Sequence, residues 1–220
     1  MAQDLRDDDE QLDALKSWWK RHGTSLVAGV LLAAAGIFGW NAWQSHQANQ
    51  TAAASQAFDQ LIALTSDFNV LDDEQRAQVD QLAEQLSDDH GGTLYAELAR
   101  LIQARVAVDA NDPDTAMASL RQVIDGAKHD YVKAVARLDL ARVQVDRQQY
   151  EEALANLEGE LPEGLLAQQA NVRGDAFQGL GRLDEARDAY RTALDLAKQH
   201  DLPIYGVQLK LDDLAPQEAS

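Results

Sequence analysis

The sequence contains no cysteine and only four prolines among its 220 residues. Without cysteine the chain can form no disulfide, and it can supply neither a thiol nucleophile nor a thiolate metal ligand. Because proline interrupts helices, its scarcity favours a helical protein, and so does the abundance of Ala, Leu, Gln and Glu. Hydrophobic residues make up 45% of the chain, which is enough to build a packed core and argues against wholesale disorder.

Basic residues are also scarce, and the formal net charge is −18. A surface this negative repels nucleic-acid phosphates, so we expect no nucleic-acid partner. It equally disfavours spreading of the folded part over anionic lipid headgroups. Two interpretations of the charge stay open: a surface that keeps the protein soluble through self-repulsion, or a face that meets a basic partner.

Charge is missing altogether from residues 26–43, which read LVAGVLLAAAGIFGWNAW. At 1.5 Å per residue a helix of this length spans about 27 Å, close to the thickness of the hydrocarbon core of a bilayer. All four tryptophans lie near its two ends, Trp18 and Trp19 before it and Trp40 and Trp43 at its close. Indole rings favour the membrane–water interface, so the pattern predicts a single transmembrane helix that contacts the lipid bilayer.

The orientation follows from Lys16, Lys20 and Arg21, which come just before the span, whereas the next lysine or arginine after it is Arg76. Positive charge is retained on the cytoplasmic side, so we expect the N-terminus in the cytoplasm of a bacterium and the remainder in the periplasm. The predicted domains are a cytoplasmic tail over residues 1–23, a transmembrane helix over 24–43 and a periplasmic helical domain over 44–220.

Two other interpretations of the apolar run compete with an anchor. A buried helix of a soluble protein is disfavoured by the flanking tryptophans and the one-sided basic residues. A cleaved signal peptide would need a small-residue site, and the nearest, residues 52–54, lies too far beyond the apolar core. Gly29, Ala33 and Gly36 share one face of the span, which leaves open whether the helix itself docks on another membrane helix.

After the anchor, helical segments recur with a fixed spacing. Ala141 corresponds to Gly174 and Ala153 to Ala186, each pair 33 residues apart, and a fainter earlier copy precedes the central one by 37 residues. Such periods indicate a repeat solenoid. The predicted repeat-packing residues are Ala104, Ala116, Ala141, Tyr150, Ala153, Leu157, Gly174, Leu183, Ala186 and Tyr190.

The spacing and the alternation of small and large residues resemble the tetratricopeptide repeat. That resemblance implies close approach of Ala141 to Ala153 and of Gly174 to Ala186, with Tyr150, Leu183 and the residues one turn later filling the core between repeats. We expect an all-α solenoid whose first helices line a binding surface. Residues 52–65 and 74–86 are interpreted as a divergent first helix pair, and 204–214 as a closing helix started by Pro203.

No pattern points to catalysis or to a cofactor. The five histidines are isolated, and the trio Asp88, Asp89 and His90 fits a helix end in solvent better than a metal site. Asp72 or Asp73 is expected to cap the next helix. Glu151 and its neighbour recur at the start of second helices, where they complement the helix dipole. We therefore expect no enzyme activity, no metal and no small-molecule substrate.

The whole chain resembles the YfgM-type ancillary subunits of the bacterial Sec translocon. Residues 15–19 (LKSWW), 36–40 (GIFGW), 43–47 (WQSHQ) and 138–145 (LDLARVQV) carry the resemblance. It implies an inner-membrane protein whose periplasmic repeats associate with the Sec translocon and with a membrane-anchored periplasmic chaperone of the parvulin-like type during protein export. An envelope-assembly scaffold that binds a different membrane complex is the alternative.

Overall fold

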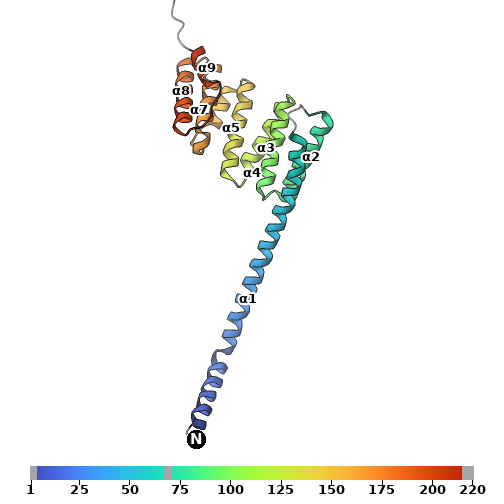
Figure 1. The fold of residues 1–220 in the computed structure, drawn as a ribbon, viewed down its shortest axis with the longest axis vertical. Helices are drawn as coiled ribbons and strands as arrows, with labels where there is room; N and C mark the ends of the chain where they lie inside the picture. Colours follow the sequence, from blue (N-terminus) through green and yellow to red (C-terminus); the bar gives the residue numbers. More distant parts are fainter. Residues whose placement is uncertain (1–3, 67–70, 215–220) are drawn as a thin grey trace, which may run out of the picture. The chain divides into compact units, whose positions relative to one another are not determined.

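A computed structural model describes residues 4–66 and 71–214, without the side chains of residues 4–15, 17, 24–26 and 30. The ends of the predicted tail and repeat domain, residues 1–3 and 215–220, lie outside the described residues. The described part is all-α and contains no strand (Figure 1). Its helices are α1 (Asp4–Thr65), α2 (Asp73–His90), α3 (Leu94–Asp109), α4 (Pro113–Gly126), α5 (Asp130–Asp146), α6 (Tyr150–Asn156), α7 (Leu166–Gly179), α8 (Leu183–Gln199) and α9 (Val207–Asp213), with a short 3₁₀ helix, η1 (Glu163–Leu165), before α7.

Helix α1 is longer than either of the helices that the sequence predicts in this region. The prediction treated the membrane span and residues 52–65 as separate helices, whereas the structure joins them in one. Residues 44–57 contain no proline or glycine and are rich in alanine and glutamine, so nothing interrupts the backbone hydrogen bonds. By length and composition this helix, from Trp18 to Thr65, can cross a membrane, and only 7% of its most apolar window is buried. Contacts divide the chain into two units, Met1–Gln50 and Thr51–Ser220.

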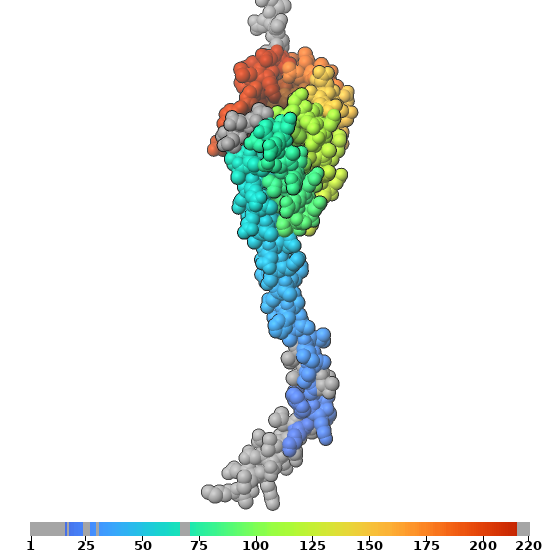
Figure 2. Space-filling view, turned by 90° about the vertical axis from the view of Figure 1, so that its right-hand side faces the viewer, coloured from blue at the N-terminus to red at the C-terminus, as the bar shows by residue number. Residues whose placement is uncertain are grey.

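In the second unit the helices follow one another in space in the order of the sequence, from α2 to α9 (Figures 1 and 2). Helices α3 and α4, α5 and α6, and α7 and α8 form three successive pairs, and α3 also contacts α5 as α5 contacts α7. This is the layered arrangement of a helical solenoid, as the repeat spacing predicts.

The turn between the two helices of each pair has the same backbone conformation. Asn111, Gln148 and Gly181 have φ angles of 56°, 61° and 73°, in the left-handed region. They are separated by 37 and 33 residues, the same offsets that the sequence repeats show. Glycine adopts this conformation without strain, whereas the other two residues do so at some cost in free energy.

Capping residues determine where several helices begin. Asp72 caps α2: its carboxylate accepts from the backbone N–H of Gln75 at 2.8 Å, and the Gln75 side chain accepts from the Asp72 N–H at 3.0 Å. This confirms the expected cap before α2. The closing helix was predicted from residue 204 but begins at Val207, because Gly206 takes a φ of 76°, which a helix cannot include.

Candidate interaction site

The predicted anchor residues lie on the exposed surface of α1. Trp18, Trp19, Trp40 and Trp43 are 45%, 54%, 63% and 56% exposed. The rings of Trp40 and Trp43 are 5.2 Å apart, so they form one aromatic pair at the end of the apolar run. The predicted topology residues Lys16, Lys20 and Arg21 are also exposed. An exposed apolar helix with aromatic ends matches the surface that a membrane covers.

Most of the predicted repeat-packing residues lie in three hydrophobic clusters. Ala104 and Ala116 share the first of these, between α3, α4 and α5. Ala141, Ala153 and Leu157 share the second, with half-buried Tyr150 packed against them. The third cluster contains Ala186 and Tyr190 from α8.

Gly174 is buried on α7, and its role differs in detail from the expected contact with Ala186. A Cβ built on Gly174 would lie 2.4 Å from Cε1 and 2.5 Å from Cδ1 of Tyr190, so glycine makes room for the tyrosine ring. The Tyr190 hydroxyl lies 2.8 Å from both Asp175 Oδ1 and Gln178 Oε1 on the same helix α7. Burial, and then the bond to Asp175, raise the pKa of Tyr190 above its ordinary value, so the ring stays neutral.

Leu183 does not fill a core between repeats, in contrast to the sequence-based expectation, because it is 45% exposed. Its counterpart Tyr150 packs against the end of α7, where a Cβ on Gly179 would lie 2.2 Å from Tyr150 Cε1. After Leu183 the only first helix that follows in the described chain is α9, which has seven residues. Leu183 therefore lacks the neighbour that its position in a longer stack would have.

The first helices α3 and α5 present the same surface pattern, which the sequence interpretation missed. On each helix, five positions spaced four, four, three and four residues apart form one stripe, since these spacings repeat on one helical face. We call these ten residues the first-helix stripe: Leu94, Leu98, Ile102, Arg105 and Asp109 on α3, and Tyr131, Val135, Asp139, Arg142 and Asp146 on α5. The 37-residue offset of the repeats, applied to the exposed and half-buried positions of the first helices, would have revealed it.

Apolar and charged residues are segregated along this stripe. At its start Leu94 and Tyr131 are 40% and 55% exposed, although both are large and apolar over most of their surface. At its other end each helix carries an arginine followed by an aspartate. Exposed large apolar side chains with charged residues on the same helix faces are compatible with a protein-binding surface.

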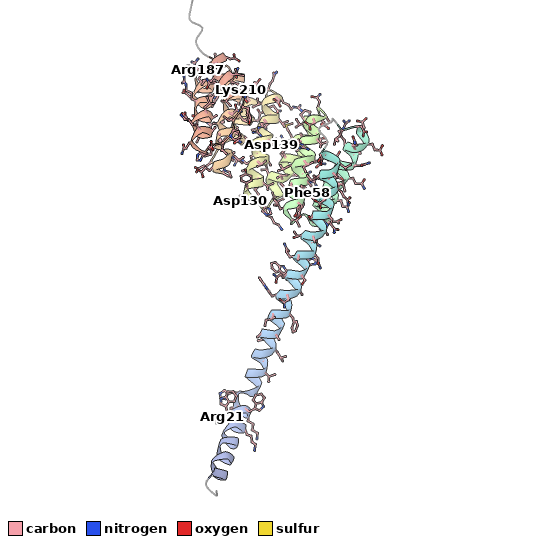
Figure 3. All side chains as sticks on the ribbon, in the orientation of Figure 1. Arg21, Phe58, Asp130, Asp139, Arg187 and Lys210 are labelled. Carbon is pink, nitrogen blue, oxygen red and sulfur yellow. The ribbon has the colours of Figure 1, made fainter. Side chains whose placement is uncertain are left out.

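Asp139 occupies the middle of the stripe on α5, where α3 has Ile102 (Figure 3). Its Oδ1 accepts a hydrogen bond of 2.6 Å from Arg142. Burial raises the pKa of Asp139 above its ordinary value, while the charge and hydrogen bond of Arg142 partly oppose that shift. This carboxylate thus joins the apolar and charged parts of the stripe, and a basic group of a partner would stabilise its charge.

The stripe ends at α7. Applying the 33-residue offset to Arg142 leads to Asp175, which is already engaged: its carboxylate binds Lys210 of α9 at 2.6 Å and the Tyr190 hydroxyl. Among the described residues no three histidine or acidic side chains come together in a way that could hold a metal ion.

Comparison with known proteins supports this description. A family model described as a tetratricopeptide repeat-like domain matches residues 16–216. A protein of Haemophilus influenzae is 29% identical over 94% of this chain and 98% of its own length, and an Escherichia coli protein is 32% identical over 85% and 87%. A Neisseria gonorrhoeae protein is 24% identical over 94% and 97%. All three are named ancillary SecYEG translocon subunit. The chain belongs to the tetratricopeptide repeat-like family of ancillary SecYEG translocon subunits.

Proposed function

We propose that this protein is a membrane-tethered interaction module that associates with the SecYEG translocon. The observation that carries the proposal is the extent of the similarity, which covers both the anchor and the repeat domain of relatives that bear this name. The tether confines the repeat domain to the membrane that contains the translocon, and the repeats supply a surface for specific contact. Its role would be binding rather than catalysis.

The proposal extends to a second partner, a membrane-anchored periplasmic chaperone that receives exported chains. The resemblance to ancillary translocon subunits motivates this link, and the first-helix stripe offers a surface for it. Leu94 and Tyr131 leave apolar area in water that a partner could cover. The two arginines at the charged end could pair with acidic residues of the same partner.

The proposed orientation has the N-terminus in the cytoplasm and the repeat domain in the periplasm. It is supported by Lys20 and Arg21 before the span, and by the lack of any lysine or arginine from there to Arg76. Alkaline phosphatase fused after Ser220 should be active, and a fluorescent protein that matures only in the cytoplasm should be dark at the same site. The opposite pair of results would refute the orientation.

The association is tested with two full-length variants that are purified from membranes in mild detergent, with the co-purified SecY quantified. In the first, residues 24–43 are replaced by an unrelated apolar span of equal length. In the second, Leu94→Arg and Tyr131→Arg place charge on the stripe, and Leu183→Arg is the matched control because it alters an equally exposed leucine on α8. We expect SecY recovery to survive the span exchange and the control, and to fall at least five-fold in the double variant.

Three results would contradict this proposal. Wild-type protein that recovers no SecY would refute the association itself. Complete loss of SecY after the span exchange, with full recovery in the double variant, would place the contact in the membrane, where Gly29 and Gly36 lie on one face. An equal loss in the Leu183→Arg control would show that the effect is not specific to the stripe.

A further inference from the structure

The second helices of the three repeats differ in length, and the middle one is short. Helix α6 has 7 residues, whereas α4 has 14 and α8 has 17. Helix α4 packs extensively against the following first helix, α5, but α6 covers much less of its own following helix, α7. Relative to α4 about two turns are missing, or about 10 Å of helix.

An open groove of about 450 Å³ lies between α7 and α8. Gln169, one of its lining residues, binds the connection that follows α6, so the groove begins where α6 ends. Its apolar lining comes from Leu166, Ala170 and Phe177 on α7 and from Ala189 and Leu196 on α8. The apolar lining positions are four and seven residues apart on α7 and seven apart on α8, so on each helix they share one face toward the groove. A groove between two such faces is the form of site that accepts an amphipathic helix.

The connection after α6 does not fill this groove. Leu157 and Leu161 are buried in the cluster shared by α5, α6 and α7, so that the apolar side chains of the connection are used elsewhere. Its backbone is also fixed, because Gln169 Nε2 donates to the carbonyl oxygens of Leu157 at 2.8 Å and Gly159 at 2.9 Å. Movement of the connection into the groove would break both bonds.

The two walls of the groove carry opposite charge. Arg173 lines the α7 side, and Glu185 and Asp188 line the α8 side. The two carboxylates are bound to Arg182 and Arg191, but these ion pairs are exposed. Exposed ion pairs contribute about 0–1 kcal/mol, so a partner's cation can replace either arginine at little cost.

We propose that this groove, residues 166–177 of α7 with 185–196 of α8, binds a short amphipathic helix of a partner protein, which takes the place of the missing turns of α6. The bound helix is two to three turns long, has an apolar side toward Phe177 and Leu196, and carries lysine or arginine toward Glu185 and Asp188. This contact is separate from the first-helix stripe and does not depend on it.

Site-specific photocrosslinking in intact membranes tests the proposal on the full-length chain. The probe is p-benzoylphenylalanine, placed at Thr192, an exposed residue that lines the groove, or at Lys198, an exposed residue of the same helix that does not. Each is combined with Glu185→Lys or with the control Asp184→Lys, whose carboxylate pairs with Arg187 away from the groove.

We expect an adduct at Thr192 whose crosslinked peptide, mapped by mass spectrometry, lies in the apolar stripe of an amphipathic segment of another protein, next to a basic residue. The adduct should fall at least five-fold with Glu185→Lys, persist with Asp184→Lys and be absent at Lys198. An adduct to residues 215–220, to a second copy or to both probe positions would overturn the proposal, as would no adduct at all. SecY recovery with the stripe variant is measured separately, so failure of the translocon association would not be mistaken for failure of the groove.

Discussion

Replacement of Gly174 by alanine tests the packing of α7 on α8 with a single methyl group. The added Cβ would be 2.4–2.5 Å from two ring carbons of Tyr190, well inside contact distance. Tyr190 is 0% exposed, and its hydroxyl lies 2.8 Å from acceptors on Asp175 and Gln178 of α7, so the ring cannot turn away without losing its hydrogen bond to α7. The helices must therefore separate or the ring must leave its position.

The expected magnitude follows from two opposing effects. Overpacking of a core by a methyl group costs about 1–3 kcal/mol, and a ring fixed at both ends favours the upper part of that range. Alanine in place of glycine within a helix recovers about 1 kcal/mol. The free energy of unfolding should thus fall by about 2 kcal/mol, which for a unit of this size lowers Tm by about 4–8 °C.

Thermal unfolding followed by circular dichroism on the full-length protein in detergent measures this change. Gly126→Ala is the control, because a Cβ there meets nothing within 4 Å and Tm should stay the same or rise slightly. Adding Tyr190→Phe to Gly174→Ala frees the ring, so the double variant should lose less than the sum of the single losses. A Gly174→Ala protein that melts within about 1 °C of wild type would refute the proposed contact.

Two further predictions concern the repeat core and a helix cap. Ala153 is 0% exposed, so Ala153→Leu should lower the free energy of unfolding by about 1–3 kcal/mol. The control Glu151→Gln, at an exposed residue, should alter it by less than about 0.5 kcal/mol. Equal shifts of Tm in the two variants would contradict the repeat register. Hydrogen bonds from Thr115 lower the pKa of Asp112 below its usual value of 3.8, so the charged cap stabilises the fold above that pH and loses this contribution as the pH falls through the lowered pKa. Asp112→Ala should cost about 1 kcal/mol near pH 7, and denaturant titrations should show that the difference from wild type shrinks below about pH 4; a constant difference would contradict this assignment.

The sequence was sufficient for the fold class and the repeat register. Ala104, Ala141 and Gly174 give repeat offsets of 37 and 33 residues. The same two offsets separate the left-handed turn residues Asn111, Gln148 and Gly181. Buried small residues are informative because two helix backbones that pack closely leave room for few residue types other than alanine and glycine. The same constraint is absent on the surface, which is why the first-helix stripe went unnoticed although it follows the same offset.

Other features depend on what lies beside a residue rather than on the residue itself. Leu183 occupies the position of Tyr150, yet it is exposed, because among the described residues only the short helix α9 follows α8. The shortness of α6 had a local signal, since Gly159 takes a φ of 84° and Pro162 follows three residues later. Gly159 and Pro162 indicate where α6 ends, but they do not show whether another part of the chain covers the exposed sides of α7 and α8. Only the structure shows this.

A membrane tether changes how strong the contacts of such a domain must be. Confinement of two proteins to one membrane gives an effective concentration in the millimolar range for short linkers. A contact with a Kd of about 1 mM, or about 4 kcal/mol, is then half occupied. Complete burial of one large apolar side chain contributes about 1.5–3 kcal/mol, and Leu94 and Tyr131 still have roughly half of their surfaces to bury. Together with the groove between α7 and α8, two modest contacts are enough for a tethered domain. The unit from Thr51 onward, without residues 1–50, should bind its partners much more weakly in solution.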